Sequence, residues 1–149
     1  MLVGAAAVCA YENSTEYAQA HWEVMTTWVD YLCEFGLDPE NQLCTDDFAG
    51  HFAHNANLSV KAIVGIGCYA RMAEMMGLED VSQKYFKVAK DLAAQWKEMA
   101  IDGEHYKLTF DREGTWSQKY NLVWDRLLGL NVFDPSITQT EIAWYLEHQ

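Results

Sequence analysis

Apolar residues recur every three or four positions along residues 17–35 and again along residues 79–101, with polar residues between them. This period is typical of an amphipathic helix that buries one face. Ser14 is the expected N-cap of the first helix, and Gly36 is expected just after its last turn. The positions expected to be buried are Tyr17, His21, Val24, Trp28, Tyr31 and Phe35 in the first helix, and Val81, Tyr85, Val88, Leu92, Trp96 and Met99 in the second.

The segment between these two helices has a different pattern. From residue 58 to residue 76 the only charged residues are Lys61, Arg71 and Glu74. Apolar or small residues therefore face every direction around the helix. Such a pattern predicts a helix that is buried on nearly all sides.

Two further segments, residues 2–10 and 119–128, are similarly apolar, and the second is expected to end near Gly129. A last amphipathic helix is expected to begin at Pro135, with Asp134 as its N-cap. The chain thus alternates buried helices with half-exposed helices. This order predicts about two and a half helical hairpins, in which inner and outer helices alternate.

An internal repeat supports this arrangement. Tyr17 and Trp28 precede Tyr85 and Trp96 by the same 68 residues. The repeating unit is a helical hairpin of about 65 residues. The loops after the two amphipathic helices align at a spacing of 64, with identical residues at Thr45/Thr109, Asp47/Asp111, Gly50/Gly114, Asn57/Asn121 and Leu58/Leu122.

The connections between helices differ in length. Those that follow an inner helix are short, at residues 11–14 and 77–80, whereas those that follow an outer helix run over residues 37–53 and 102–118. All long loops are therefore expected at one end, above the N-termini of the inner helices. Binding and catalytic groups usually gather on such loops. Within the second loop, the alternation of residues 105–111 predicts a short β-hairpin.

Inner helices surrounded by outer helices form an α/α toroid. A ring of six hairpins of about 65 residues each would need nearly four hundred residues, and the chain has 149. We therefore predict an all-α fold that is part of an (α/α)6 toroid, as one partial domain over residues 1–149. The rest of the ring would come from a longer parent protein or from self-association, because exposed inner-helix faces promote contact.

The charge of the chain argues against two classes of partner. Ten Lys and Arg residues stand against 22 Asp and Glu residues, which gives a formal net charge of −12 at pH 7. Binding to nucleic acid or to an anionic membrane requires clustered basic residues, and here they occur singly. We expect no nucleic-acid partner, no membrane partner and no cofactor. Cys9, Cys33, Cys44 and Cys68 show no Cys/His spacing of a zinc site. Three of the four lie in apolar helical segments, where a thiol usually behaves as a small hydrophobe, so free thiols are favoured over disulfides.

Two segments resemble a known family. Residues 42–63, QLCTDDFAGHFAHNANLSVKAI, and residues 114–125, GTWSQKYNLVWD, are similar to the six-helical-hairpin domain of the glutaminase A family. The resemblance covers nearly the whole chain and implies an (α/α)6 toroid related in fold to six-hairpin glycosidases. It also implies an exported hydrolase, extracellular or periplasmic, with L-glutaminase activity. The family's remaining hairpins and its preceding β-rich region have no counterpart in the chain.

Carboxylates in the two long loops are the candidate catalytic residues. Asp47 and Asp111 occupy equivalent positions, so they can face one another as an acid/base pair for hydrolysis. Asp46 is the alternative to Asp47, because neighbouring residues of an extended segment point in opposite directions. Loop bracing or helix capping is the competing interpretation for each carboxylate.

Polar and aromatic residues near these loops are the candidate substrate contacts. They are His51, His54, Asn55, Asn57, Trp116, Gln118, Lys119, Tyr120 and Asn121. The two histidines make a metal site conceivable, but loop hydrogen bonds or a substrate contact are favoured, and no metal is expected. Asn57 and Asn121 can instead begin inner helices, and Lys119 can hold a substrate carboxylate. One turn further along, Lys61 and Asp125 are expected to form a buried ion pair.

Three functions remain open at this point. The first is hydrolysis of the side-chain amide of L-glutamine, with water activated by Asp47 or Asp111. The second is a glycoside hydrolase or a carbohydrate-binding domain, in which Trp116 and Tyr120 would stack on a sugar. The third is a structural segment without chemistry. For the first two, the expected partner is a small molecule, either an amino acid amide or a sugar.

Overall fold

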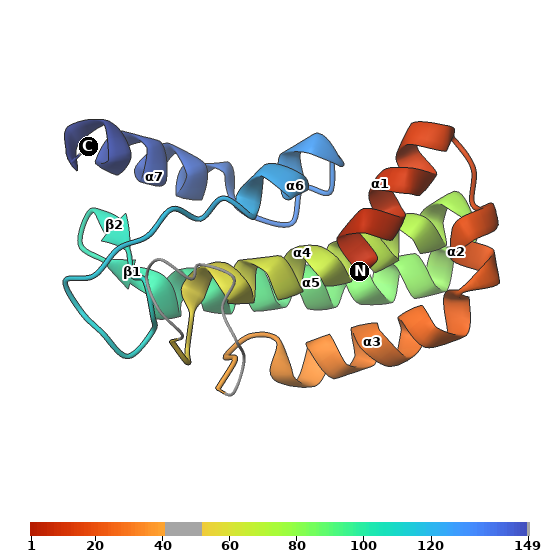
Figure 1. Ribbon diagram of the computed structural model, residues 1–149, viewed down its shortest axis with the longest axis horizontal. Coiled ribbons are helices and arrows are strands. Elements are labelled where there is room, and N and C mark those ends of the chain that lie inside the picture. Colours follow the sequence, from red (N-terminus) through yellow and green to blue (C-terminus); the bar gives the residue numbers. More distant parts are fainter. Residues whose placement is uncertain (41–51, 149) are drawn as a thin grey trace.

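The computed structural model describes residues 1–40 and 52–148 of the chain (Figure 1). Two short strands, β1 and β2, pair antiparallel directly after α5, and every other regular element in these ranges is a helix. The prediction of an all-α fold is therefore confirmed. The elements are α1 (Leu2–Glu12), α2 (Glu16–Ala20), α3 (Trp22–Phe35), α4 (Ala56–Met75), α5 (Glu79–Ala100), β1 (Ile101–Asp102), β2 (His105–Tyr106), α6 (Leu122–Leu127) and α7 (Pro135–His148).

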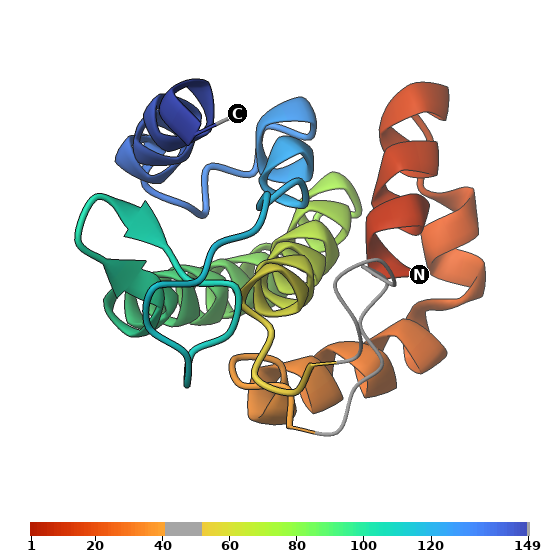
Figure 2. The same ribbon diagram turned by 60° about the vertical axis from the view of Figure 1, so that its left-hand side comes forward.

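Helix α4 lies at the centre of the described structure and contacts α1, α3, α5 and α6 (Figures 1 and 2). Fourteen of its twenty residues are buried, as the all-round apolar pattern predicts. Two glycines allow its neighbours to approach. A Cβ on Gly65 would lie 3.2 Å from Leu32 Cδ1 on α3, and a Cβ on Gly67 would lie 3.0 Å from Val132 Cγ2. Small residues on the central helix thus set the spacing of the surrounding elements.

Helix α5 buries the face that its apolar period predicts. Tyr85 and Trp96 are buried, and Val81, Val88 and Leu92 pack against the core. The indole Nε1 of Trp96 donates a hydrogen bond to the backbone oxygen of Ala56, at the start of α4, over 2.9 Å. The outer helix of this pair is therefore fixed to the inner helix at the end that carries the long loops.

The buried face predicted for residues 17–35 is wrong. Met25 and Val29 are the buried residues of α3, whereas the predicted stripe remains 37–51% exposed at Val24, Trp28, Tyr31 and Phe35. The segment carries apolar residues on two faces, and the period alone does not say which face meets the core. Contacts with Tyr69 on α4 determine which face of α3 is buried. Its ring stacks on Trp22 at a centroid distance of 4.2 Å, and its hydroxyl lies 2.6 Å from Thr26 Oγ1.

The same segment is divided at His21, where the single predicted helix separates into α2 and α3. Neither Pro nor Gly occurs at this point, so local sequence gives no signal for the break. The predicted N-cap Ser14 is wrong, because Thr15 is the N-cap of α2. Ser14 Oγ instead accepts a hydrogen bond from Glu16 N over 3.3 Å, from a position two residues before the start of α2. Gly36 ends α3 in a right-handed conformation, at φ −78°. A glycine is needed there because a Cβ would lie 2.8 Å from Ala62 Cβ.

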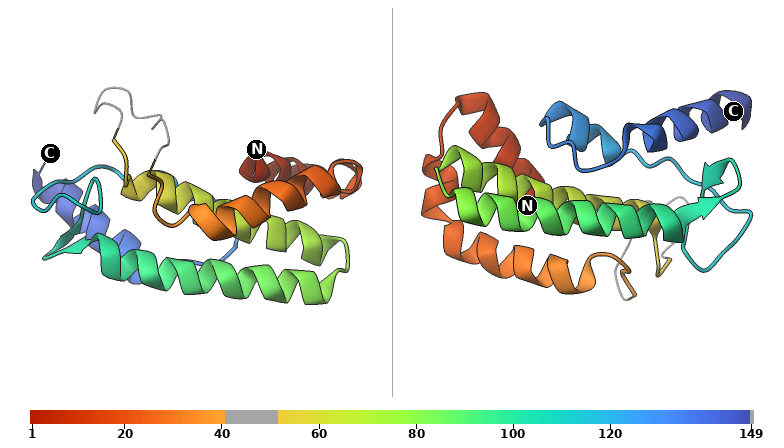
Figure 3. Two further views of the ribbon diagram at one scale, coloured as in Figure 1. Left: turned by 90° about the horizontal axis from the view of Figure 1, so that it is seen from below. Right: turned by 180° about the vertical axis from the view of Figure 1, so that it is seen from behind.

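The short connections and the long loops lie at opposite ends of the helices, as predicted (Figure 3). The short connection from α4 to α5 turns at Gly77, at φ +74°. The β-hairpin lies at residues 101–106, slightly before the predicted residues 105–111, because Gly103, at φ +60°, turns the chain immediately after α5.

The connection between α6 and α7 depends on two aspartates. Asp134 Oδ1 accepts a hydrogen bond from Ser136 N over 2.9 Å, which confirms it as the cap of α7. Asp125 accepts backbone hydrogen bonds from Val132 over 3.0 Å and from Phe133 over 3.4 Å. The predicted ion pair between Asp125 and Lys61 is wrong, because Lys61 is exposed on another side of α4. Equal depth along two inner helices did not make these side chains face each other.

The described cysteines are free thiols. Cys9 and Cys68 are buried and Cys33 is partly buried, while Cys44 lies outside the described residues. Burial raises the pKa of the Cys68 thiol to about 12, so it stays protonated and unreactive at neutral pH. In the described ranges, no helix combines the length and the apolar character that crossing a membrane requires.

The helices on either side of the central pair, α4 and α5, expose more large apolar side chains than that pair does. On α4 and α5, together with the turn between them, Leu78 is the exposed large apolar residue, at 37%. The flanks expose Val24, Trp28, Tyr31 and Phe35 on α3, Val123 and Leu127 on α6, and Ile142 and Leu146 on α7. Exposed apolar surface of this extent usually marks a contact with another chain or segment.

Candidate functional site

The two long loops meet above the first turn of α4. The backbone of Asn55 forms an isolated antiparallel bridge with Thr109, and Phe110 N donates to His54 O over 2.9 Å. Residues 52–55 of the first loop are thereby joined to residues 108–110 of the second. The surface formed by these segments and by residues 111–121 is called the loop end below. It brings together residues that lie more than fifty positions apart in the sequence.

His54 is a titratable group of this surface. Its Nδ1 lies 2.7 Å from Asp38 Oδ1, and both side chains are partly exposed. The hydrogen bond to Asp38 raises the pKa of the His54 imidazole, and the nearby charge of Asp111 acts in the same direction. His54 therefore keeps its proton to a higher pH than an ordinary histidine does. A group of this kind can donate a proton in a reaction near neutral pH.

Asp111 is exposed at the same surface. The neighbouring side chain of Thr109 lowers the pKa of Asp111, with smaller contributions from the charges of Arg112 and His54. The carboxylate is therefore ionised throughout the neutral range. The other candidate catalytic residues, Asp46 and Asp47, lie outside the described residues, as does His51.

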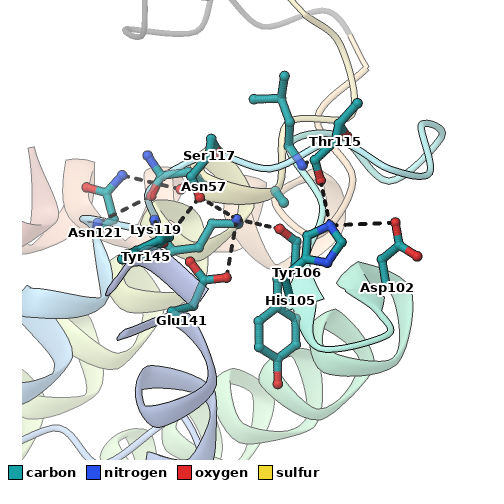
Figure 4. Close-up of polar contacts among 12 residues, drawn as sticks. Asn57, Asp102, His105, Tyr106, Thr115, Ser117, Lys119, Asn121, Glu141 and Tyr145 are labelled. Atoms are coloured by element: carbon teal, nitrogen blue, oxygen red, sulfur yellow. Dashed lines mark hydrogen bonds and ion pairs between the residues drawn. The ribbon is translucent and has the colours of Figure 1, made fainter. Parts of the chain in front are cut away.

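Three asparagines were candidate substrate contacts, and all three are buried. Asn55 is the N-cap of α4, and its Oδ1 accepts from Leu58 N over 2.8 Å. Its Nδ2 has no hydrogen-bond partner among the described residues. Asn57 Oδ1 accepts from Asn121 N, and Asn121 Nδ2 donates to Asn57 O, both over 3.3 Å (Figure 4). These repeat-equivalent asparagines therefore join the starts of α4 and α6.

Lys119 points into the protein rather than across the loop end (Figure 4). Its ammonium donates to Tyr106 O over 2.9 Å and to Ser117 O over 2.7 Å, and it lies 3.6 Å from Glu141 Oε1 on α7. Its backbone N–H donates to the hydroxyl of Tyr145 over 2.9 Å. The predicted contact with a substrate carboxylate remains untested, and this placement favours a structural role.

The remaining candidates lie on the segment that leads to α6. Trp116 and Tyr120 are exposed aromatic residues, and Gln118 is exposed between them. The ring of Trp116 lies 5.7 Å, between centroids, from that of Tyr145 on α7. These side chains are accessible to a ligand that approaches the loop end.

Two residues that sequence reasoning missed brace this loop. Asp102 Oδ2 accepts from Gly114 N over 2.6 Å, and His105 Nε2 lies 3.2 Å from Thr115 O (Figure 4). The His105 ring also stacks on Trp144 at a centroid distance of 4.2 Å. Asp38, the partner of His54, was missed as well. No periodicity or motif connects these residues, because their pairing depends on how the two loops fold over the helices.

No metal site is indicated in the part of the chain that the structure describes. Within residues 1–40 and 52–148, no three His, Cys, Asp or Glu side chains are grouped as metal ligands. Among the described residues, the loop end carries an imidazole with a raised pKa, His54, and an ionised carboxylate, Asp111.

Asp38→Asn is expected to lower the pKa of His54 toward the ordinary value of a histidine. An amide cannot stabilise the imidazolium as a carboxylate does. A raised pKa in the folded state stabilises the protein at low pH, and this contribution disappears as the pH rises through that pKa. The variant should therefore lose stability mainly below the pKa of His54.

The titration of the His54 ring, followed by NMR in the wild-type chain and in Asp38→Asn, tests this expectation. Glu40→Gln serves as the control, because the charge of Glu40 is the last and smallest of the contributions to the His54 pKa. An equal fall of the His54 pKa in both variants would show that the surrounding negative charge, rather than the hydrogen bond to Asp38, sets this pKa.

Comparison with known proteins gives one family and two curated relatives. Residues 1–149 match the family described as the glutaminase A six helical-hairpin domain. The chain is 32% identical over 149 residues to glutaminase A of Aspergillus oryzae, covering 97% of this chain and 22% of that protein. It is 40% identical over 116 residues to a probable glutaminase of Arthroderma benhamiae, covering 76% of this chain and 13% of that protein. No solved structure gives a significant match.

Proposed function

Because the chain belongs to the family of the glutaminase A six helical-hairpin domain, we propose that its loop end forms part of the active site of a glutaminase-like amide hydrolase. The chain spans about a fifth of the length of the first curated relative and about an eighth of the second. The proposal therefore concerns a contribution to a site that other segments can complete.

The observation that carries this proposal is that the segments of His54 and Asp111 are joined at the loop end, where Phe110 N donates to His54 O. Hydrolysis of an amide requires a water molecule to attack the carbonyl carbon and a proton to reach the departing nitrogen. The Asp111 carboxylate, ionised at neutral pH, is suited to orient the water and to accept a proton from it as it attacks the carbonyl carbon. His54 is suited to give its proton to the leaving ammonia, since its pKa is raised by Asp38. With Nδ1 held by Asp38, Nε2 is the ring nitrogen available for this transfer.

Ammonia release from L-glutamine, measured on the protein at its natural length, tests the proposal. Asp111→Asn is expected to reduce kcat by about 10²-fold or more, the usual size of an acid/base contribution. Glu113→Gln is the matched control, because Glu113 is an exposed carboxylate two residues further along the same loop. The control should retain activity close to that of the wild type.

Two results would overturn the assignment. An absence of ammonia release from L-glutamine would reject the amidohydrolase. Equal activities of Asp111→Asn and the wild type would reject the role of Asp111. Export from the cell, which the family resemblance implies, is part of the proposal, and fractionation of a producing culture would test it.

A carbohydrate ligand is the second candidate, and exposed aromatic residues at the loop end favour it. Trp116 and Tyr120 are 38% and 44% exposed, and aromatic faces of this kind can stack on sugar rings. A ligand that binds only the folded state raises the melting temperature. A thermal-shift screen with a panel of glycans and with L-glutamine would therefore separate the two candidates.

A further inference from the structure

A groove lies between α1 and α3, with α4 as its floor. Its volume is about 410 Å³, and its walls include Leu2, Trp28, Phe35, Leu58, Ala62 and Gly65. Among the described residues that line it, Lys61 has the one charged side chain. The groove is thus an apolar surface of the described structure, and it coincides with the exposed stripe of α3.

The internal repeat indicates what normally covers such a stripe. Trp28 on α3 is equivalent to Trp96 on α5, 68 residues further along. Trp28 is 37% exposed, whereas Trp96 is fully buried. The indole of Trp96 lies against the first turn of α4, where it donates to Ala56 O. In the second hairpin, formed by α4 and α5, the first turns of α4 therefore cover the position of Trp96.

The first hairpin lacks the corresponding cover in the described structure. Helix α4 has 20 residues and α1 has 11, and each ends at the short connection to its outer helix. A helix as long as α4 that ended where α1 ends would extend about 13 Å further, at 1.5 Å per residue. The N-terminal residues Met1, Leu2 and Val3 line one end of the groove. The extension would therefore pass over Trp28 and Phe35.

We propose that the groove is the docking site of an apolar helical segment of about nine residues that continues α1 at its N-terminal side in a longer protein. The curated relatives, of which this chain spans 22% and 13%, have ample chain outside the matched region. The occupant is an apolar face of a helix, because the groove offers one cation and otherwise apolar walls. Its expected effect is to bury Trp28 as Trp96 is buried.

An extended version of the chain tests this proposal. The nine residues ANLSVKAIV, copied from positions 56–64 at the start of α4, replace Met1 and lead directly into Leu2 in helical register. The melting temperature is expected to rise by about 5 °C or more, and acrylamide quenching of Trp28 is expected to fall severalfold. The fluorescence that comes from Trp28 is obtained, for each chain, as the difference between that chain and its Trp28→Phe variant.

The matched control carries an extension of the same length in which the four large apolar residues are replaced by Glu or Gln. It should leave both the quenching and the melting temperature unchanged. Trp28→Glu should remove the gain in the extended chain and change the unextended chain little. Should the extended chain fail to fold, the same nine residues added as a free peptide provide the second measurement, with protection of Trp28 as the expected result.

Three results would overturn the proposal. Equal effects of the apolar and polar extensions would show that the groove does not select an apolar helix. A sedimenting dimer of the unextended chain, with Trp28 already protected from acrylamide, would make a second copy the occupant. Absence of protection by both the fused and the free segment would leave the groove without a helical occupant.

Discussion

Trp96→Ala is expected to lower the free energy of unfolding by about 3–5 kcal/mol, the usual cost of deleting a large aromatic side chain from a core. Trp96 is fully buried and contacts the rings of Tyr106 and Phe133 at centroid distances of 5.2 and 5.8 Å. The substitution also removes the hydrogen bond that the indole Nε1 donates to Ala56 O. Urea unfolding of the wild-type chain and of the variant measures the difference.

The repeat supplies a matched control for this prediction. Trp28→Ala removes the same side chain at the equivalent position of α3, where the indole is partly exposed. A cost below about 1.5 kcal/mol is expected, because less surface returns to water and no buried cavity forms. Similar losses in the two variants would mean that Trp28 is covered in solution. They would also contradict the picture of an open groove.

Lys119→Met is expected to cost about 3–5 kcal/mol, because it leaves the buried carboxylate of Glu141 without its counter-charge. The two side chains are 1% and 4% exposed. The ammonium also bridges Tyr106 O and Ser117 O, so the variant releases the segment that leads to α6. Unfolding by urea at pH 7 measures this loss.

The double variant Lys119→Met with Glu141→Leu is expected to recover much of the lost stability, since no unpaired charge remains. The pH dependence provides a second check. Burial raises the pKa of Glu141. A carboxyl group with a raised pKa in the folded state costs stability as the pH rises through that pKa. The defect of Lys119→Met should therefore be smaller at mildly acidic pH than at neutral pH, and a defect independent of pH would contradict this account.

The sequence predicted the order of the helices well, because each signal for it is local. The all-round apolar pattern of residues 58–76 identifies a central helix, and Asp134 before Pro135 identifies a helix start. Neither inference needs knowledge of distant residues. The spacing of 64 between Asn57 and Asn121 was informative for a different reason, since equivalent positions of neighbouring hairpins lie at equal depth. The hydrogen bonds between these two residues follow from that geometry.

The wrong predictions concern the rotation of a helix about its own axis, which decides which of its faces is buried. Trp28 and Val29 belong to two apolar faces of the same helix, and only the stacking of Trp22 on Tyr69 selects the face that contains Val29. Lys61 and Asp125 lie at equal depth but point in different directions. The pairing of His54 with Asp38 could not be predicted from the sequence either, because it depends on the path of a loop rather than on a pattern along the chain.

The separation of tight turns from long loops has a practical consequence for engineering. The turn between α4 and α5 lies at the far end of the helices from the two long loops (Figure 3). A fluorescent label or an immobilising tag attached there would leave the loop end undisturbed. The entropic cost of closing a flexible loop grows only slowly with its length. The loop end can therefore be varied by grafting or lengthening its loops, while the helical scaffold is kept constant.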